Sequence, residues 1–367
     1  MLVWLLKTWE PLREYVGGIS AGDSPILLTL RIALASVTSF LAALLLGPVA
    51  IGFLRRRFPE RVRSASSTLN ALHEHKNDTP TMGGIFVVAS VFVATIFWGN
   101  WENRFVLLST CVVGSYGVLG VIDDAVKLRT ERRGLSVRQK FLGQLAMALF
   151  WSVLLYFEQQ RQPLGLALVW PVGNVVWPLG LLFIGWSVLL IVATANAVNL
   201  TDGMDGLAAG CTVTSAAAYT VLCYLAGHRV LAEYLAIPYI PGSGEMAVVL
   251  GALAGAMLGF LWFNAHPADV FLGDAGSLPI GAMLAVAALT IHQELLLPVI
   301  GGVFVAETLS VILQVASFRL TGRRIFACSP LHHHFLFRGL PETKIVVRFW
   351  IVSAVLAVAG LASLKVR

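Results

Sequence analysis

The sequence predicts an all-α protein that crosses a membrane about ten times. Three observations support this fold class: 57% of the 367 residues are hydrophobic, 13% are charged, and the mean hydropathy is +0.79. Soluble domains carry about 25% charged residues. A helix needs about 20 mainly apolar residues to cross the hydrocarbon core of a bilayer, and runs of this length recur along the chain. An integral membrane protein is therefore predicted.

Residues 1–25 are predicted to form an N-terminal segment outside the helical domain. Their short apolar start is interrupted by Lys7, Glu10 and Arg13, so they lack the long hydrophobic core and cleavage site of a removed signal peptide. Trp4 and Trp9 favour a segment lying at the membrane interface. An unanchored tail is the alternative.

Residues 26–367 are predicted to form a single transmembrane catalytic domain of ten helices. Each predicted span is an apolar run bounded by charged residues, glycine or proline. In chain order, the spans are residues 26–54, 82–99, 104–122, 140–157, 178–198, 204–225, 246–263, 276–292, 295–317 and 345–364.

The distribution of Lys and Arg predicts how these spans are oriented. The loops after the first, third and ninth spans are rich in basic residues, whereas the loops on the other side carry only Arg104, Arg161 and Arg229. Because basic loops remain in the cytoplasm, both termini are predicted to lie outside, with the active site on the cytoplasmic face. The net charge of +6 then reflects membrane orientation, and no nucleic-acid partner is expected.

The first polar cluster is the pair Asp123 and Asp124, which directly follows the third span. Neighbouring carboxylates repel each other, and a bound divalent cation relieves that repulsion. Lys127 lies four residues after Asp123 and shares its face if the helix continues. A solvated helix end with a salt bridge is the alternative interpretation.

The second cluster contains Asn199, Asp202 and Asp205, which recur at every third position. This spacing predicts one helical face that carries an amide and two carboxylates. No Lys or Arg stands nearby in the sequence to neutralise them, so a cationic or hydrogen-bonding ligand is expected. A capped helix start with a tight turn is the alternative.

The third cluster runs from Asn264 to Ser277 and contains no basic residue. Asp274 follows Gly273, and glycine allows close backbone approach to a phosphate or a metal. Phe271 offers a ring for stacking on a nucleotide base, although a membrane-facing phenylalanine is an equal alternative.

The fourth cluster is the triplet His332, His333 and His334 in a basic loop. Consecutive side chains diverge on a helix or strand, so the three rings cannot all ligate one metal. Phosphate contact is therefore favoured over zinc. Glu307 and Gln314 stand on one face of the ninth span, and this face is predicted to turn into the protein or toward a wet cavity.

A fifth candidate lies at the start of the second span, where Lys76 precedes the run Thr79-Pro80-Thr81. Exposed N–H groups at this helix start would suit an anion. A purely structural turn, with Thr79 or Thr81 as the cap and Pro80 in the first turn, is the alternative.

Acidic clusters beside basic loops indicate phosphoryl transfer between an anionic, metal-bound substrate and a membrane acceptor. The order of the motifs resembles the phospho-N-acetylmuramoyl-pentapeptide transferase family, or translocase I, over nearly the whole chain. Leu336 departs from the family pattern, which has an acidic residue soon after the histidines. The matching motifs are Thr79-Pro-Thr-Met-Gly-Gly84, Asp123-Asp124 with Lys127, Asn199 to Gly206, Asp269 to Ser277, Gly301 to Gln314, and His332 to His334.

The resemblance implies transfer of phospho-MurNAc-pentapeptide from UDP-MurNAc-pentapeptide to undecaprenyl phosphate, which gives lipid I and UMP for peptidoglycan synthesis. It also implies Mg²⁺, a homodimer and the bacterial inner membrane. Asp274 becomes a metal ligand, Asp123 a base or nucleophile, and Asp124 a metal or phosphate partner. The implied substrate-binding residues are Lys76, Thr81, Lys127, Lys140, Asn199, Asp202, Asp205, Asn264, Phe271, Ser277, Gln314, His332, His333 and His334.

Two other functions remain open at this point. A polyprenyl-phosphate GlcNAc-1-phosphate transferase shares the aspartate clusters but not this combination of Thr79-to-Gly84 and histidine motifs. A proton-coupled carrier could instead use Glu307 and Asp274. Release of UMP from a nucleotide substrate would indicate an enzyme, and substrate flux without turnover would indicate a carrier.

Overall fold

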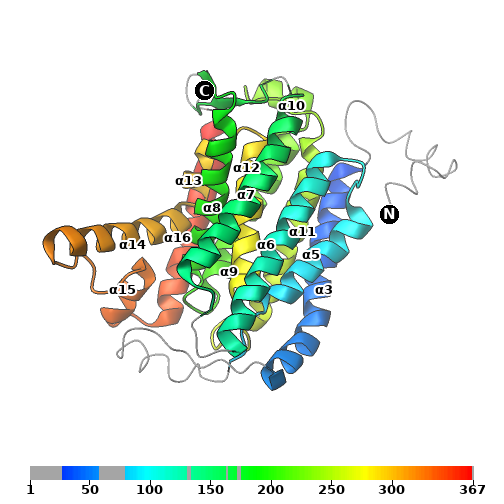
Figure 1. The fold of residues 1–367 in the computed structure, drawn as a ribbon. Helices are drawn as coiled ribbons and strands as arrows, with labels where there is room; N and C mark the ends of the chain where they lie inside the picture. The colour runs from blue at the N-terminus through cyan, green and yellow to red at the C-terminus, as the bar shows by residue number, and fades with distance from the viewer. Residues whose placement is uncertain (1–26, 58–78, 130–133, 163, 172–174, 366–367) are drawn as a thin grey trace.

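The computed structural model describes residues 27–57, 79–129, 134–162, 164–171 and 175–365 and shows a bundle of long helices (Figure 1). Within these residues, eight helices are long and apolar enough to cross a membrane, and two shorter apolar helices, α5 (Gly84–Trp98) and α12 (Asp274–Thr290), coincide with the second and eighth predicted spans. The predicted fold class is confirmed. The eight long helices are α3 (Leu28–Arg57), α6 (Arg104–Arg129), α7 (Val137–Gln159), α8 (Leu182–Thr201), α9 (Leu207–Ala226), α11 (Met246–Asn264), α14 (Gly302–Thr321) and α16 (Glu342–Ala362).

Short elements that the sequence did not predict connect these helices. Strands β1 (Ala167–Val169) and β2 (Val176–Pro178) form an antiparallel pair between α7 and α8, with Leu168 opposite Trp177. Three-residue strands are too short to show the alternating pattern that predicts a strand. The other short elements are α10 (Arg229–Tyr234), α13 (Leu297–Ile300), α15 (Leu331–Phe337), η2 (Ser243–Glu245), η3 (Glu294–Leu296) and η4 (Ser363–Lys365).

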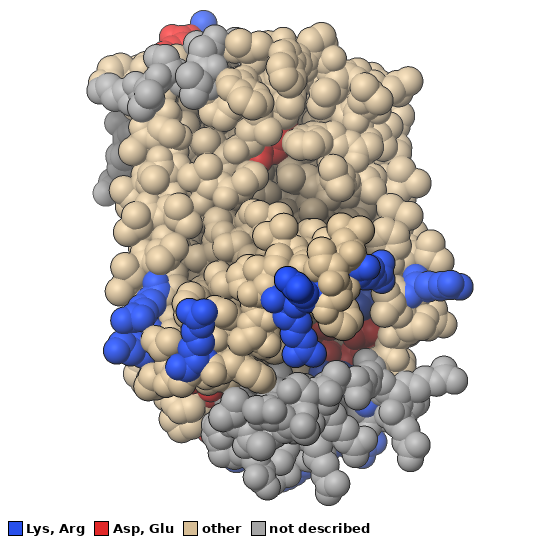
Figure 2. All heavy atoms as spheres, turned by 90° about the vertical axis from the view of Figure 1, so that its left-hand side faces the viewer, with Lys and Arg blue, Asp and Glu red and all other residues tan. Residues whose placement is uncertain are grey.

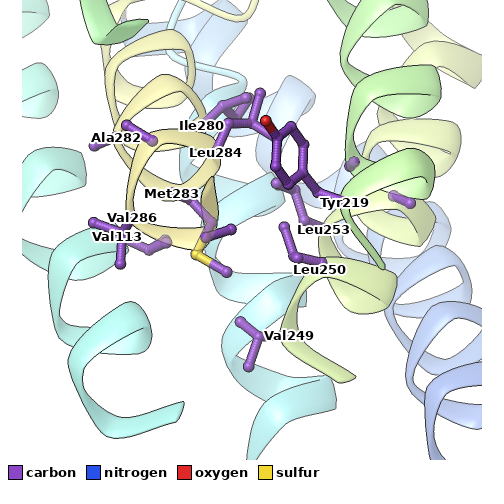
Figure 3. Packing of buried hydrophobic residues seen from close by; sticks show 14 of the residues in the cluster. Val113, Tyr219, Val249, Leu250, Leu253, Ile280, Ala282, Met283, Leu284 and Val286 are labelled. Atoms are coloured by element: carbon purple, nitrogen blue, oxygen red, sulfur yellow. The ribbon is translucent and has the colours of Figure 1, made fainter. Parts of the chain in front are cut away.

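Helix α12 forms the centre of the bundle, packed against α5, α6, α8 and α9. Every residue of α12 after Asp274 is buried. Figure 3 shows Met283 and Leu284 of α12 among Tyr219 of α9, Leu253 of α11 and other apolar side chains. A helix that is apolar on all sides is stable only when neighbouring helices or lipid enclose it, and here the other helices do so.

Glycines allow α5 and α6 to approach the start of α12 backbone to backbone. A Cβ atom at Gly84 would lie 2.0 Å from the Gly276 nitrogen, and one at Gly120 would lie 2.1 Å from the Asp274 carbonyl oxygen. No side chain fits at either distance. The C-terminal part of α6 therefore lies directly beside the first residue of α12, which brings the first and third polar clusters together.

The ninth predicted span is not one straight helix, which corrects the sequence prediction. The apolar run 295–317 is interrupted at Gly301, between α13 and α14, because glycine favours helix ends over helix interiors. Figure 1 shows α14 extending sideways from the bundle. Leu309, Ile312 and Phe318 are among its exposed apolar residues, as expected for a helix that contacts lipid.

A buried ion pair joins the start of α3 to the start of α11. Arg31, near the start of α3, pairs with Glu245, just before α11, with 2.5 Å between Nη2 and Oε2. Arg31 Nε also donates to the carbonyl oxygen of Trp98 at the end of α5 (2.8 Å). Residues 1–25, and with them the predicted interfacial segment, lie outside the described residues, as does Lys76.

Candidate active site

Three aspartates converge where α6 ends and α12 begins. Asp123, Asp124 and Asp274 each place a carboxylate oxygen within 4.8 Å of the others. The first two are buried, and Asp274 is partly exposed. The structure thus unites two clusters that are about 150 residues apart in the sequence, and the cause is the glycine contact between Gly120 and the Asp274 backbone.

The start of α12 is fixed by Gly273 and Asp124. Gly273 has a φ angle of +70°, a backbone conformation that glycine adopts without strain. Asp124 Oδ2 accepts a hydrogen bond from the backbone N–H of Ala275 (3.1 Å). This contact places a carboxylate at the positive end of the helix dipole. Asp124 therefore has a structural as well as an electrostatic role at the site.

Lys140 is the lysine that contacts both Asp123 and Asp274. Its ammonium group binds Asp274 Oδ2 directly and lies 3.7 Å from Asp123 Oδ2. Lys127 lies one turn after Asp123 on the exposed surface of α6, and the helix continues past it, which is the condition under which the two residues share a face.

A capping box fixes the position of Lys140. Ser136 Oγ accepts from the backbone N–H of Gln139, and Gln139 Oε1 accepts from the backbone N–H of Ser136. Such a reciprocal pair fixes the first turn of a helix, and Lys140 follows immediately. Leu135, just before the cap, donates its N–H to Asp123 Oδ1 (2.9 Å). The spacing of Ser136 and Gln139 was a signal that the sequence interpretation missed.

Asn199 holds the other oxygen of Asp274. It lies in the last turn of α8, and its amide nitrogen donates to Asp274 Oδ1 and to Ser277 Oγ (2.8 Å). The Ser277 hydroxyl in turn donates to the Gly273 carbonyl oxygen (2.9 Å). The structure therefore brings the predicted residues Asn199, Asp274 and Ser277 into one network.

The three aspartates fit a divalent cation. Carboxylate oxygens are the protein ligands that Mg²⁺ prefers, and the three carboxylates each place an oxygen within 4.8 Å of the others. A divalent cation would relieve the repulsion between them. Asp274 and Asp124 are the predicted ligands, and the structure adds Asp123 to the same donor set.

Asp205 does not share a helical face with Asn199, which corrects the prediction from their three-residue spacing. Helix α8 ends at Thr201 with Asp202 as its C-cap, so Asn199, Asp202 and Asp205 do not line one helical face. The turn that follows places Asp205 Oδ2 2.8 Å from His266 Nδ1. Glu342 completes this second group, and the sequence interpretation had assigned no role to either His266 or Glu342.

Asn264 holds the surrounding loops together. Its side-chain oxygen accepts from the backbone N–H of Gly206 (3.0 Å), and its side-chain nitrogen donates to the carbonyl oxygen of Val270 (2.8 Å). It is buried. The described contacts therefore give Asn264 a positioning role, while the predicted substrate contact stays untested.

The helix start at Gly84 does not offer free amides for an anion, contrary to the sequence interpretation. The backbone N–H groups of Gly83 and Gly84 donate to the carbonyl oxygens of Phe271 and Leu272, at 2.9 and 2.8 Å. Neither Thr79 nor Thr81 caps α5, whose N-cap is Gly83 without a side-chain bond. This motif instead pairs with the loop that precedes Asp274.

The three consecutive histidine side chains point to different surroundings, as expected for neighbouring residues of a helix. His332 is fully buried, with Nδ1 3.1 Å from Glu307 Oε2, and its ring packs against Gly203. A phosphate contact by His332 is not supported, because the ring is enclosed. Glu307 faces the protein interior, as predicted. His333 is partly exposed, and its phosphate role stays a prediction.

His334 and Gln314 hold the loop between α14 and α15. His334 Nδ1 accepts from the backbone N–H of Ala327 (3.1 Å). Partial desolvation and the charge of Arg338 lower the pKa of His334, which favours the neutral ring that this contact requires. Gln314 Oε1 accepts from the N–H groups of Ile325 and Phe326. Its amide thus serves the loop rather than the carboxylate site.

Comparison with known families agrees with this site. Residues 105–292, just over half of the chain, match glycosyl transferase family 4. The chain belongs to this family. Residues 76–88 also match phospho-N-acetylmuramoyl-pentapeptide-transferase signature 1, and this segment contains Gly84, which contacts the start of α12. This member of glycosyl transferase family 4 is therefore a multi-pass membrane phosphosugar transferase of the phospho-N-acetylmuramoyl-pentapeptide-transferase type.

Proposed function

We propose that the chain transfers phospho-MurNAc-pentapeptide from UDP-MurNAc-pentapeptide to undecaprenyl phosphate and releases UMP. The observation that carries this proposal is the convergence of Asp123, Asp124 and Asp274 with Lys140 and Asn199 at one end of a membrane bundle. This combination suits a phosphoryl-transfer site, because the reacting phosphates are anionic and the transition state spreads their charge. The signature at residues 76–88 supports the choice of sugar.

In the proposed reaction, an oxygen of the lipid phosphate attacks the sugar-bound phosphorus of the nucleotide substrate. A new P–O bond forms to the lipid phosphate, the pyrophosphate bond to UMP breaks, and UMP leaves with the bridging oxygen. Asp123 accepts the proton of the lipid phosphate if that group arrives protonated. Lys140 donates to phosphate oxygens from its position between Asp123 and Asp274.

Mg²⁺ is the proposed cofactor, with Asp274 and Asp124 as its ligands and Asp123 beside them. When bound, the cation neutralises charge that develops on the phosphate oxygens. The proposed nucleotide pocket contains Asp205 and Phe271, together with Lys76, which lies outside the described residues. A homodimer in the bacterial inner membrane, with the site on the cytoplasmic side, completes the proposal.

The test is substrate selection by the purified chain in lipid nanodiscs that contain undecaprenyl phosphate. We expect a lipid-linked product with UDP-MurNAc-pentapeptide and little or none with UDP-GlcNAc at the same concentration. A lipid-linked product with UDP-GlcNAc but none with UDP-MurNAc-pentapeptide would instead support the GlcNAc-1-phosphate transferase. An Asp274→Asn variant, purified in parallel, is the control for contaminating activity.

A further inference from the structure

The turn between α8 and α9 is held by the C-terminal helix α16. The backbone N–H of Asp205 donates to Glu342 Oε1 (2.9 Å), and the carbonyl oxygen of Gly206 accepts from Trp350 Nε1 (3.0 Å). Glu342 is the first residue of α16, and Trp350 lies about two turns later. One helix therefore contacts two consecutive residues of the turn, which fixes the turn's position along that helix.

The side chain of Asp205 is held from the opposite side by the loop after α11. Asp205 Oδ2 accepts from the backbone N–H of Ala268 (3.3 Å) and lies 2.8 Å from His266 Nδ1. Asp205 is 3% exposed, so its carboxylate has little freedom to reorient. Its backbone and its carboxylate are thus fixed by two different parts of the chain.

The contact with Trp350 leaves no space for the turn to shift toward α16. A Cβ atom at Gly210 would lie 2.2 Å from Trp350 Nε1, and one at Gly206 would lie 3.2 Å from Trp350 Cζ2. Gly206 also has a φ angle of +79°, which favours glycine at this position. The indole ring therefore packs directly on the backbone that leads from Asp205 into α9.

We propose that Glu342 is a positioning residue for Asp205, and that Trp350 assists it through Gly206. This inference rests on the proposed function, in which Asp205 contacts the nucleotide. Glu342 clusters with Asp205 and His266, whereas Asp274 clusters separately with Asp123 and Asp124. Loss of the Glu342 contact is therefore expected to weaken nucleotide binding more than the chemical step.

A purely structural role for Glu342 predicts a different pattern of variants. Glu342 is the acidic residue in the first turn of α16, where a negative charge stabilises a helix through its dipole. Glutamine removes that charge but keeps the oxygen that accepts the Asp205 N–H. Alanine removes both. Glu342→Gln and Glu342→Ala consequently separate the hydrogen bond from the helix charge.

The experiment measures kcat, KM for UDP-MurNAc-pentapeptide and the melting temperature Tm of wild type, Glu342→Gln and Glu342→Ala. We expect Glu342→Ala to raise KM about tenfold with kcat changed by less than about threefold, and Glu342→Gln to stay within about threefold of wild type. Equal KM values for the alanine variant and wild type would overturn the positioning role. Equal defects in Glu342→Gln and Glu342→Ala would also overturn it.

Trp350→Phe provides a second test if Glu342→Ala does not fold. Phenylalanine keeps an aromatic ring near Gly210 but removes the N–H that binds the Gly206 carbonyl oxygen. We expect KM to rise about threefold or more, again with a smaller change in kcat; an unchanged KM would overturn the role of Trp350. A wild-type chain that releases no UMP would contradict the proposed function itself, whereas an active wild type with unaffected variants would contradict only the positioning role.

Discussion

At the scale of single residues, the three aspartates of the site differ in how they are held. Asp274 contacts Lys140 and Asn199, and Asp124 accepts the N–H of Ala275 at the start of α12. Asp123 accepts the N–H of Leu135 and lies farther from the Lys140 ammonium group, at 3.7 Å. In the proposed mechanism, Asp274 and Asp124 are the metal ligands and Asp123 is the base.

The base assignment predicts that Asp123→Asn is partly rescued at alkaline pH. The second proton of a phosphate monoester has a pKa near 6, so it leaves without help as the pH rises. We expect the variant to lose at least about hundredfold in kcat below about pH 6 and to recover about tenfold or more near pH 9. The measurement is the pH profile of kcat for variant and wild type.

A covalent role of Asp123 would give a different result. Activity that stays absent at every pH, together with a phosphosugar adduct trapped by acid quench of wild type with nucleotide substrate alone, would contradict the base assignment. The Asp123→Asn variant must trap no such adduct, which controls for non-covalent carry-over.

The buried carboxyl of Glu294 is expected to make the free energy of unfolding depend on pH. It lies in η3, is 1% exposed, and burial raises its pKa from 4.5 to about 8. Between these values the unfolded chain has released a proton that the folded chain keeps, so the stability of the folded state falls as pH rises through this window. We expect Glu294→Gln to flatten that fall and to raise Tm by at least about 3 °C relative to wild type near pH 9.

The measurement for Glu294 is Tm of both proteins from about pH 4 to about pH 9. The difference between the two Tm curves isolates this carboxyl from the other titrating groups. A difference that stays constant across the range would show that Glu294 does not keep its proton on folding.

The residue types at the site could be predicted from the sequence, but their pairing could not. Adjacent carboxylates at Asp123 and Asp124, and a glycine before Asp274, are local signals. The pairing of Asp123 with Lys140 is not a local signal. It depends on where α7 begins, and the capping box sets that position. Regular three-residue spacing also misplaced Asp205, since the sequence does not show where α8 ends.

At the scale of helices, packing around α12 decides where the site forms. Long apolar runs predict the helices themselves, because each must cover about the thickness of the bilayer. They do not predict which helices touch. In the structure, Gly84 and Gly120 each contact the backbone at the start of α12. A glycine in a sequence does not show which backbone it will contact.

This packing predicts that Gly84→Ala is far more damaging than Gly185→Ala. An added Cβ at Gly84 would lie 2.0 Å from the Gly276 nitrogen, whereas one at Gly185 of α8 would meet nothing within 4 Å. Overpacking costs about 1–3 kcal/mol, and alanine is a better helix residue than glycine by about 1 kcal/mol. We expect lower Tm and at least about tenfold lower kcat for Gly84→Ala, with Gly185→Ala unchanged or slightly stabilised.

The measurement is Tm together with kcat for both glycine variants. Gly185→Ala controls for the general effect of alanine on a membrane helix. If Gly84→Ala retained wild-type Tm and kcat, the close approach of α5 and α12 would not be needed to form the site.

At the scale of the whole molecule, apolar and basic side chains occupy separate regions on one face. Figure 2 shows one face on which Lys and Arg side chains form a band near one end, with a broad belt almost free of charged residues above it. Such a division is expected for a protein with basic groups at the cytoplasmic interface. The interruption at Gly301 and the sideways direction of α14 were not predictable, because hydropathy records apolar length but not helix direction.

The orientation can be tested by cysteine labelling in intact spheroplasts. In an active variant without the four natural cysteines, we expect a cysteine at Arg132 to be protected from a membrane-impermeant thiol reagent and one at Gln162 to be labelled. Permeabilisation should expose the first position. Labelling of Arg132→Cys from outside would reverse the topology and separate the carboxylate site from a cytoplasmic nucleotide.

A three-aspartate site that transfers a phosphosugar releases UMP, whereas transfer of the sugar alone would release UDP, so the identity of the released nucleotide distinguishes the two reactions. Purified protein is incubated with UDP-MurNAc-pentapeptide, undecaprenyl phosphate and Mg²⁺, and nucleotide and lipid products are quantified together. We expect one UMP for each lipid product, and a loss of at least about hundredfold in both for folded Asp274→Asn. Release of UDP, or near-normal turnover by Asp274→Asn, would contradict phosphosugar transfer at this site.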